Sequence, residues 1–265
     1  MKYLLKISLL ALVLTSCQTK TKTESTVIED VKASDITTSI YPDNVTKVFN
    51  AHGGIDNWNS MRTLSFTMTK PNGKEVTTTN LKTRAERIET PTYAMGFDGE
   101  TLWVNEKGGE AYKGNARFYK GLMMYFYAMP FILGDSGIIY EETTSLTFEG
   151  KTYPGILISY ESGVGESPDD QYILYYDDTT GKMAWLAYTV TFGKDEKSTD
   201  FRYIRYDDWQ TINGLILPKS ISWYKYEDKV PTEKRNTLVF EDIQLTNEAP
   251  DQSLFAKPES AKIID

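Results

Sequence analysis

The stretch from Arg117 to Leu133, which reads RFYKGLMMYFYAMPFIL, constrains the fold most, because it is the longest apolar segment in the body of the chain. From Gly121 to Leu133 it contains no charged residue. It is too short to cross a membrane, which takes about 20 apolar residues, and Pro130 interrupts it. Its good helix formers predict a helix that ends or kinks at Pro130. Such a segment is either dry core or the lining and lid of a cavity for an apolar ligand, and both interpretations stay open.

Short strands separated by turns account for most of the remaining chain. From Thr63 onward, apolar residues such as Leu64 and Phe66 alternate with polar ones, which is the period of a strand. Asp98-Gly99 and Asn213-Gly214 are hairpin turn signals. Roughly ten strands of this kind predict a mainly β fold. We expect a single, strongly curved antiparallel sheet, a half-barrel with a few helices plugging its concave face.

Two local patterns refine this prediction. A helix is expected from Asp43 to Gly53, and His52, the only histidine, lies on its apolar stripe, which favours a packed residue over a catalytic base. A hairpin is expected from Tyr172 to Thr191, and its residues are apolar on both faces. A sheet that is apolar on both faces must be covered on both faces.

The N-terminal sequence predicts where in the cell the protein is located. Residues 1–16 have a basic start and an apolar run, as a secretory signal peptide does, and Leu14-Thr15-Ser16 precede Cys17, the only cysteine. This resembles the lipobox of bacterial lipoproteins, in which the cysteine is lipidated; a plain signal peptide with an incidental cysteine is the alternative. Residues 17–40 are then a lipidated cysteine with a polar, disordered tether, and residues 41–265 are the β domain. Some surface-exposed bacterial lipoproteins carry an acidic run directly after the lipidated cysteine. Here Thr19, Lys20 and Thr21 stand at that place, which favours the periplasmic face of the outer membrane.

Composition and motifs exclude several classes of function. The formal net charge of −8 argues against a nucleic-acid partner, which requires basic patches. Adjacent acids such as Asp177-Asp178 point to opposite faces of a strand or lie in turns, so they do not converge on one substrate atom. The sequence contains no G-x-S-x-G, Walker or H-E-x-x-H pattern. We therefore expect no catalytic residues, no metal and no cofactor, and a protein that is not an enzyme.

Two motifs resemble the lipoprotein-sorting carriers LolA and LolB. These are Asp98 to Val104, DGETLWV, and Asp208 to Pro218, DWQTINGLILP. The stretches AHGGIDNWNSMRTLSF, FYKGLMMYFYAMPF, FEGKTYPGI and RYDDWQTINGLILP are similar to a family of uncharacterised lipoproteins from Bacteroidota. The resemblance to the carriers implies an open, strongly curved sheet whose cavity receives acyl chains. This sequence differs from the soluble carrier, which has no lipid anchor. It also differs from the anchored receptor, because the receptor's exposed apolar loop tip has no evident counterpart here.

Three hypotheses follow from these observations. The first is an anchored lipoprotein that binds an apolar ligand, such as a lipid or an acyl chain like palmitate. In this hypothesis the protein takes part in lipid or lipoprotein trafficking. The resemblance to the carriers implies that residues of the central stretch and of two strands bind this ligand, namely Trp103, Leu122, Tyr125, Phe126, Met129, Phe131 and Trp185. The second is a non-enzymatic scaffold or regulatory module that binds a protein partner in the cell envelope. The third is a hydrolase that uses two facing carboxylates.

Overall fold

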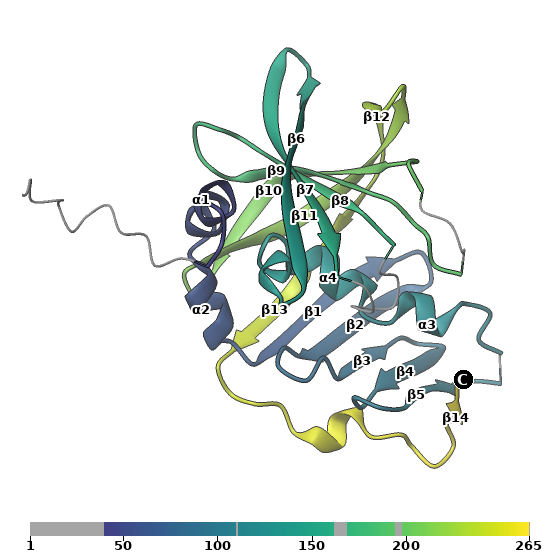
Figure 1. Ribbon diagram of the computed structural model, residues 1–265. Helices are drawn as coiled ribbons and strands as arrows, with labels where there is room; N and C mark the ends of the chain where they lie inside the picture. Colours follow the sequence, from purple (N-terminus) through teal and green to yellow (C-terminus); the bar gives the residue numbers. More distant parts are fainter. Residues whose placement is uncertain (1–39, 110, 162–168, 194–197, 265) are drawn as a thin grey trace, which may run out of the picture. The chain divides into compact units, whose positions relative to one another are not determined.

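A computed structural model describes residues 40–109, 111–161, 169–193 and 198–264 (Figure 1). The chain divides into two units, Met1–Thr38 and Ser39–Asp265, and all described residues belong to the second. The predicted signal peptide, Cys17 and most of the predicted tether lie outside the described residues. Within these residues, no helix has the length and apolar character needed to cross a membrane.

The strands form two antiparallel sheets of seven strands each. Sheet A has the order β13-β1-β2-β3-β4-β5-β14 and sheet B has the order β12-β11-β10-β9-β8-β7-β6. The strands of sheet A are β1 (Thr63–Lys70), β2 (Gly73–Asn80), β3 (Glu86–Glu89), β4 (Tyr93–Phe97), β5 (Leu102–Glu106), β13 (Glu241–Thr246) and β14 (Lys262–Ile263). Those of sheet B are β6 (Ile138–Phe148), β7 (Lys151–Tyr160), β8 (Tyr172–Tyr176), β9 (Met183–Tyr188), β10 (Arg202–Ile212), β11 (Leu215–Glu227) and β12 (Val230–Val239).

The predicted single, strongly curved sheet is therefore wrong, although the mainly β class is confirmed. The reason lies at the edge of β5, where β14 pairs with it through Lys262 opposite Val104 and Ile263 opposite Trp103. Because this edge is already hydrogen-bonded, β6 cannot continue sheet A from β5. The chain instead leaves sheet A after β5, runs through the central apolar stretch and begins sheet B with β6.

The central stretch forms short helices where one longer helix was expected. These are α3 (Ala116–Tyr119), α4 (Leu122–Tyr127) and the 3₁₀ helix η2 (Phe131–Gly134). Asn115 begins α3 by accepting a hydrogen bond from the Phe118 amide at 3.0 Å. Gly121, between α3 and α4, has a φ of +74°, a conformation that favours glycine and breaks the helix there.

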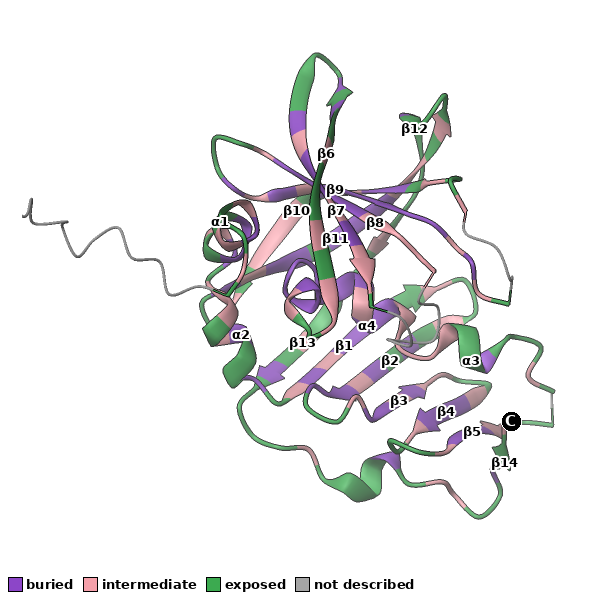
Figure 2. Cartoon of the chain, viewed as in Figure 1, coloured by how far each residue is buried: buried purple, intermediate pink, exposed green. Residues whose placement is uncertain are grey.

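The main core lies where α4 packs between the two sheets, as the buried residues in Figure 2 show. On the side of sheet A, the Tyr127 ring stacks on Phe66 with a centroid distance of 5.0 Å. On the side of sheet B, the buried Tyr206 hydroxyl donates to the Phe126 carbonyl at 2.9 Å. These contacts join the central stretch to both sheets.

Helices α1 (Asp43–Ala51) and α2 (Ile55–Ser60) complete the main core. His52 follows α1 and is fully buried, so the expectation of a packed histidine is confirmed. Its Nδ1–H donates to the Ile216 carbonyl at 2.9 Å, and its Nε2 accepts from the Met183 amide at 3.0 Å. This arrangement requires the neutral ring, and burial lowers the pKa of His52 to about 4.

The outer face of sheet B is also apolar and has its own buried cluster, as predicted for the Tyr172 to Thr191 hairpin. Phe148 of β6 contacts Trp185 of β9 at a centroid distance of 4.8 Å. Tyr224 of β11 contacts the same Trp185 ring at 4.8 Å. The two faces of sheet B are thus buried in separate clusters.

Candidate functional site

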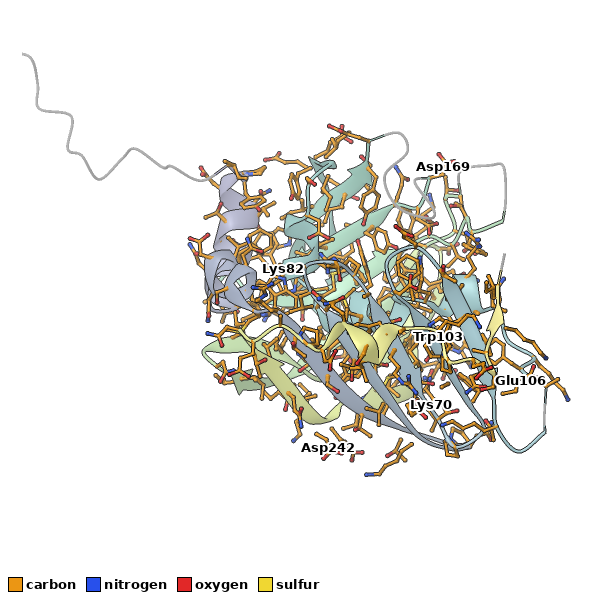
Figure 3. All side chains as sticks on the ribbon, turned by 90° about the horizontal axis from the view of Figure 1, so that it is seen from below. Lys70, Lys82, Trp103, Glu106, Asp169 and Asp242 are labelled. Carbon is orange, nitrogen blue, oxygen red and sulfur yellow. The ribbon has the colours of Figure 1, made fainter. Side chains whose placement is uncertain are left out.

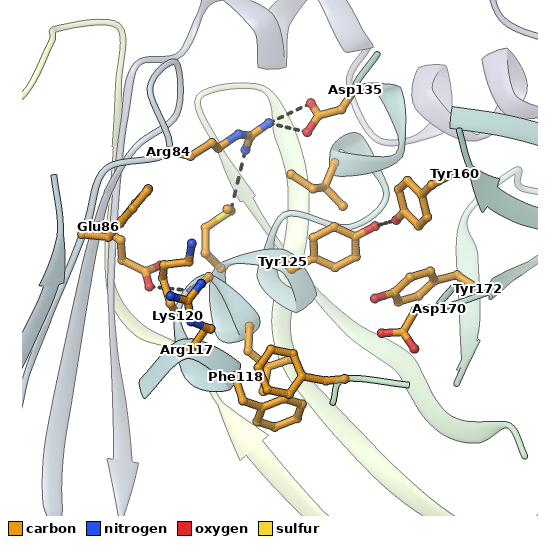
Figure 4. A pocket seen from close by; sticks show the side chains of 16 residues that line it. Arg84, Glu86, Arg117, Phe118, Lys120, Tyr125, Asp135, Tyr160, Asp170 and Tyr172 are labelled. Atoms are coloured by element: carbon orange, nitrogen blue, oxygen red, sulfur yellow. Dashed lines mark hydrogen bonds and ion pairs between the residues drawn. The ribbon is translucent and has the colours of Figure 1, made fainter. Parts of the chain in front are cut away.

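A groove of about 320 Å³ lies between α3 and α4, sheet A and sheet B (Figure 4). We call it the tyrosine groove. Its apolar and aromatic lining consists of Phe97, Phe118, Leu122, Met124, Tyr125, Ile132, Tyr160, Tyr172 and Phe192. Its charged lining consists of Arg84, Glu86, Arg117, Lys120, Asp135 and Asp170. The groove therefore combines apolar walls with charged groups, as many sites for small ligands do.

Three tyrosines form the wall on the side of sheet B. The hydroxyl of Tyr125, from α4, is hydrogen-bonded to that of Tyr160, from β7. The Tyr172 ring, from β8, lies 5.3 Å from the Tyr125 ring and 6.0 Å from the Tyr160 ring, measured between centroids. Burial raises the pKa of all three hydroxyls, so they stay neutral at physiological pH. This wall is therefore uncharged and aromatic, with hydroxyl groups within it.

On the side of sheet A, Glu86 of β3 attaches the start of α4 to the sheet. Its side chain is buried, and its Oε1 accepts a hydrogen bond from the Gly121 amide at 2.7 Å. Its Oε2 accepts a longer bond from the Thr79 hydroxyl at 3.3 Å. Burial raises the pKa of Glu86 to about 7. Glu86 thus holds the start of α4 at a fixed distance from β3.

The other two carboxylates of the groove also have partners. Asp135 makes a bidentate pair with Arg84, with distances of 2.7 and 2.6 Å. Asp170 accepts from the Thr191 amide at 2.6 Å and from the Thr191 hydroxyl at 2.9 Å. Burial raises the pKa of both carboxyls, and Arg84 opposes this effect at Asp135. All three carboxylates of the groove therefore hold neighbouring segments in place.

Two of the predicted ligand-binding residues, Leu122 and Tyr125, line the tyrosine groove. Phe126, Met129 and Phe131 belong to the same central stretch, but they are buried in the main core and do not line the groove.

The two predicted tryptophans lie elsewhere. Trp103 of β5 is fully buried in a small cluster with Ala94 and Ala261, and its Nε1–H donates to the Phe255 carbonyl at 2.9 Å. Trp185 of β9 lies in the cluster on the outer face of sheet B. The structure therefore does not bring the seven predicted residues together in one place.

Sequence reasoning missed most of the walls of the groove. Phe118, Met124 and Ile132 belong to the apolar stretch that was singled out, so their signal was present. Tyr160 and Tyr172 come from separate strands, and which strand face meets α4 depends on contacts distant in sequence. Among the described residues, no group of three or more histidine, cysteine, aspartate or glutamate side chains is arranged to hold a metal ion.

Comparisons with known proteins add a family and several distant neighbours. Residues 5–246 match a family described as "Family of unknown function (DUF6503)". No curated protein matches the sequence.

The matches among solved structures include three bacterial proteins. A LolA superfamily protein from Nitrosomonas europaea has a TM-score of 0.45 and 10% identity, over 74% of this chain and 89% of its own. A DUF1329 family protein from Desulfovibrio piger has a TM-score of 0.45 and 9% identity, over 81% of this chain and 98% of its own. MucB of Pseudomonas aeruginosa, in complex with MucA, has a TM-score of 0.24 and 10% identity, over 84% of this chain and 64% of its own. The LolA superfamily is thus among the structural neighbours, at scores too low to transfer a function, and the resemblance to Bacteroidota lipoproteins stays a prediction.

Proposed function

Because the chain belongs to DUF6503, a family of unknown function, we propose its function from the tyrosine groove: it binds a small apolar or amphipathic ligand, such as one acyl chain. The single observation that carries this proposal is the uncharged wall of Tyr125, Tyr160 and Tyr172, which lines the same cavity as the apolar side chains of Leu122 and Met124. In this proposal the protein acts in the cell envelope and is anchored there through lipidated Cys17.

The size of the groove supports one small ligand rather than a large one. Its volume of about 320 Å³ lies at the lower end of the range for small-molecule pockets. Each methylene removed from water contributes about 0.8 kcal/mol, before the cost of ordering the ligand is subtracted. A single acyl chain can therefore gain useful affinity here.

The residue types of the groove suit a ligand of variable shape. Leu122 and Met124 offer flexible apolar side chains, and methionine repacks readily around different ligands. Arg84, with its partner Asp135, places charge at the same cavity as the apolar walls. An amphipathic ligand would meet both environments, with its chain against the tyrosines and its polar end against the charged groups.

We also propose that the groove binds its ligand without catalysis. A hydrolase of the carboxylate type needs an acid and a base that face one substrate bond. Glu86 and Asp170 are instead bonded to backbone amides, and Asp135 is paired with Arg84. Using any of these groups in a reaction would release the segment that it holds.

The test uses the unit Ser39–Asp265, delipidated and titrated with a fluorescent fatty-acid probe. The expected result is saturable binding that palmitate displaces. Leu122→Trp should fill the groove and weaken probe binding at least about tenfold, which corresponds to 1.4 kcal/mol. Val239→Trp, at an exposed position of β12, is the matched control and should bind normally. Absence of saturable binding would refute the proposal, and so would equal binding by the two tryptophan variants.

The full-length protein, extracted from membranes, separates the proposal from its main alternative. Native mass spectrometry should find a bound lipid of low mass. A stoichiometric protein partner with no lipid would instead favour the scaffold hypothesis.

A further inference from the structure

A second cavity, of about 380 Å³, lies at one end of sheet A, and we call it the Lys70 pocket. The turn after β1, the turn between β3 and β4, and the segment leading into α3 surround it. Figure 3 labels Lys70 on the strands of this sheet. Of the residues that line the Lys70 pocket, only Phe118 also lines the tyrosine groove, so the two cavities are separate sites.

The wall of the Lys70 pocket contains an ion pair whose carboxylate is buried and whose ammonium is partly exposed. The side chain of Glu75 is 3% exposed, and its Oε1 lies 2.9 Å from the Lys70 ammonium. The Tyr119 hydroxyl donates to the same Oε1 at 2.6 Å, and the Tyr93 hydroxyl donates to Oε2 at 3.5 Å. Lys70 also contacts the Tyr119 hydroxyl and lies 4.7 Å from the centroid of its ring. Every member of this network has a partner within the protein.

The charges of Lys70 and Glu75 determine whether the pocket favours a charged or a neutral ligand. The carboxylate and the ammonium cancel, so the pocket presents no net charge from this pair. An anionic ligand would draw Lys70 away and leave the buried Glu75 carboxylate without its counter-charge, which is strongly unfavourable. A cationic ligand would lie beside the Lys70 ammonium and be repelled by it. The Lys70 pocket therefore favours a neutral ligand.

The hydrogen-bonding groups that remain suit a ligand with several hydroxyls. An ammonium has three N–H groups, and Lys70 uses two of them on Glu75 and Tyr119. The Asn72 and Asn115 side chains also line the pocket, and Asn115 uses its oxygen to accept from the Phe118 amide. A side-chain amide has two N–H donors in addition to that oxygen. Donors and acceptors thus surround the cavity.

Aromatic rings supply the remaining walls. Tyr93 and Tyr112 meet edge to face with their centroids 4.7 Å apart, and Phe118 and Tyr119 line the pocket from α3. Such rings stack against the apolar C–H face of a flat or ring-shaped ligand. A neutral ring with a C–H face and a rim of hydroxyls satisfies the charge, the hydrogen bonds and the walls together. We propose that the Lys70 pocket binds a neutral hexopyranose unit, alone or as part of a larger glycan.

The test is saturation-transfer NMR on the full-length protein, kept in a zwitterionic detergent that has no sugar head group. The neutral probes are glucose, galactose, mannose and N-acetylglucosamine, and the charged probes are glucuronate and glucosamine. At least one neutral probe should bind, with a Kd on the order of 1 mM, and the charged probes should bind at least about tenfold more weakly.

Two variants locate the binding. Tyr112→Ala removes one ring of the wall and should weaken binding roughly two- to tenfold, the range measured for aromatic contacts. Asn72→Ala, in an exposed turn, removes hydrogen-bonding groups without disturbing packing and should also weaken binding. Val239→Ala, at an exposed position of β12, is the matched control and should leave sugar binding unchanged.

Three results would overturn the proposal. They are no saturation transfer to any neutral probe, equal or tighter binding of the charged probes, and unchanged binding in both pocket variants. Because the probes are sugars, failure here leaves the binding of fatty acid in the tyrosine groove unaffected.

Discussion

Two buried groups, His52 and Glu86, should give the stability of this protein opposite dependences on pH. His52 is fully buried and its neutral ring bridges the Ile216 carbonyl and the Met183 amide. Burial lowers its pKa from 6.5 to about 4. Glu86 is 3% exposed, and burial raises its pKa from 4.5 to about 7. Both groups therefore favour the neutral form in the folded protein.

The sign of each effect follows from which state binds more protons. Between pH 4 and 6.5 the unfolded chain protonates its histidine and the folded protein does not, so the His52 contribution to stability is lost as the pH falls. Between pH 4.5 and 7 the folded protein keeps Glu86 protonated and the unfolded chain does not, so this contribution is lost as the pH rises. At 1.4 kcal/mol for each pKa unit, each effect amounts to about 3 kcal/mol. In the wild type the two effects largely cancel.

Removing one group should reveal the effect of the other. In Glu86→Gln, His52 acts alone, and the free energy of unfolding should rise by about 3 kcal/mol, relative to wild type, between pH 4 and 7. In His52→Gln, Glu86 acts alone, and the same quantity should fall by a similar amount. Urea unfolding followed by tryptophan fluorescence at several pH values measures both. The comparison uses the pH dependence only, because either substitution also shifts stability by a constant amount. Variant curves that run parallel to wild type would refute the reasoning.

Three further changes have defined outcomes. Tyr206→Phe leaves the buried Phe126 carbonyl without its donor and should lower the free energy of unfolding by about 1–2 kcal/mol in urea; an unchanged midpoint would contradict this. Gly96→Ala places a Cβ 2.3 Å from the Trp103 ring and should cost about 1–3 kcal/mol, with a changed tryptophan emission; wild-type emission and stability would count against it. Cys17→Ser should move the protein from the membrane fraction to the soluble fraction, as loss of acyl chains requires; retention in the membrane would argue against lipidation.

Tyr226→Phe is the matched control for the buried hydroxyl. Its hydroxyl donates to Asp200 at 2.7 Å in an exposed setting. Because water can replace an exposed partner, this variant should unfold almost as the wild type does.

Local features of the fold were predictable from the sequence because their causes are local. The turn at Asn213-Gly214 joins β10 to β11, and both residues have positive φ, as the dipeptide predicts. Helix α1 begins at Asp43, and glycines with positive φ follow it at Gly53 and Gly54. The apolar alternation on both faces of the β8–β9 hairpin correctly indicated a sheet buried on both sides.

The division into two sheets was not predictable from the same patterns. It depends on Lys262 and Ile263 pairing with β5, across more than half of the chain. The alternation of apolar and polar residues along a strand does not specify which other strand pairs with its edge. The chain crosses between the sheets a second time at Phe240, between β12 and β13, and that residue carries no turn signal.

The candidate site was predictable in part for the same reason. The central stretch was predicted to be either core or the lining of a cavity; Leu122 and Tyr125 line a cavity, whereas Phe126 and Met129 lie in the core. Helix geometry decides which of its other residues face inward, and the break at Gly121 changed that geometry. Trp103 and Trp185 were expected at the cavity from the resemblance to the sorting carriers, but each lies in a cluster formed by strand pairing that no local pattern specifies.

The most direct test of the account is an NMR titration of Ser39–Asp265 with palmitate, observed through the methyl groups of methionine, leucine and isoleucine. The methyl groups of Met124, Leu122 and Ile132, which line the tyrosine groove, should shift and saturate together. Those of Met129 and Met183, buried in the main core, should stay in place. No saturable shift, or shifts at Met129 without shifts at Met124, would contradict the proposal that the tyrosine groove is the ligand site.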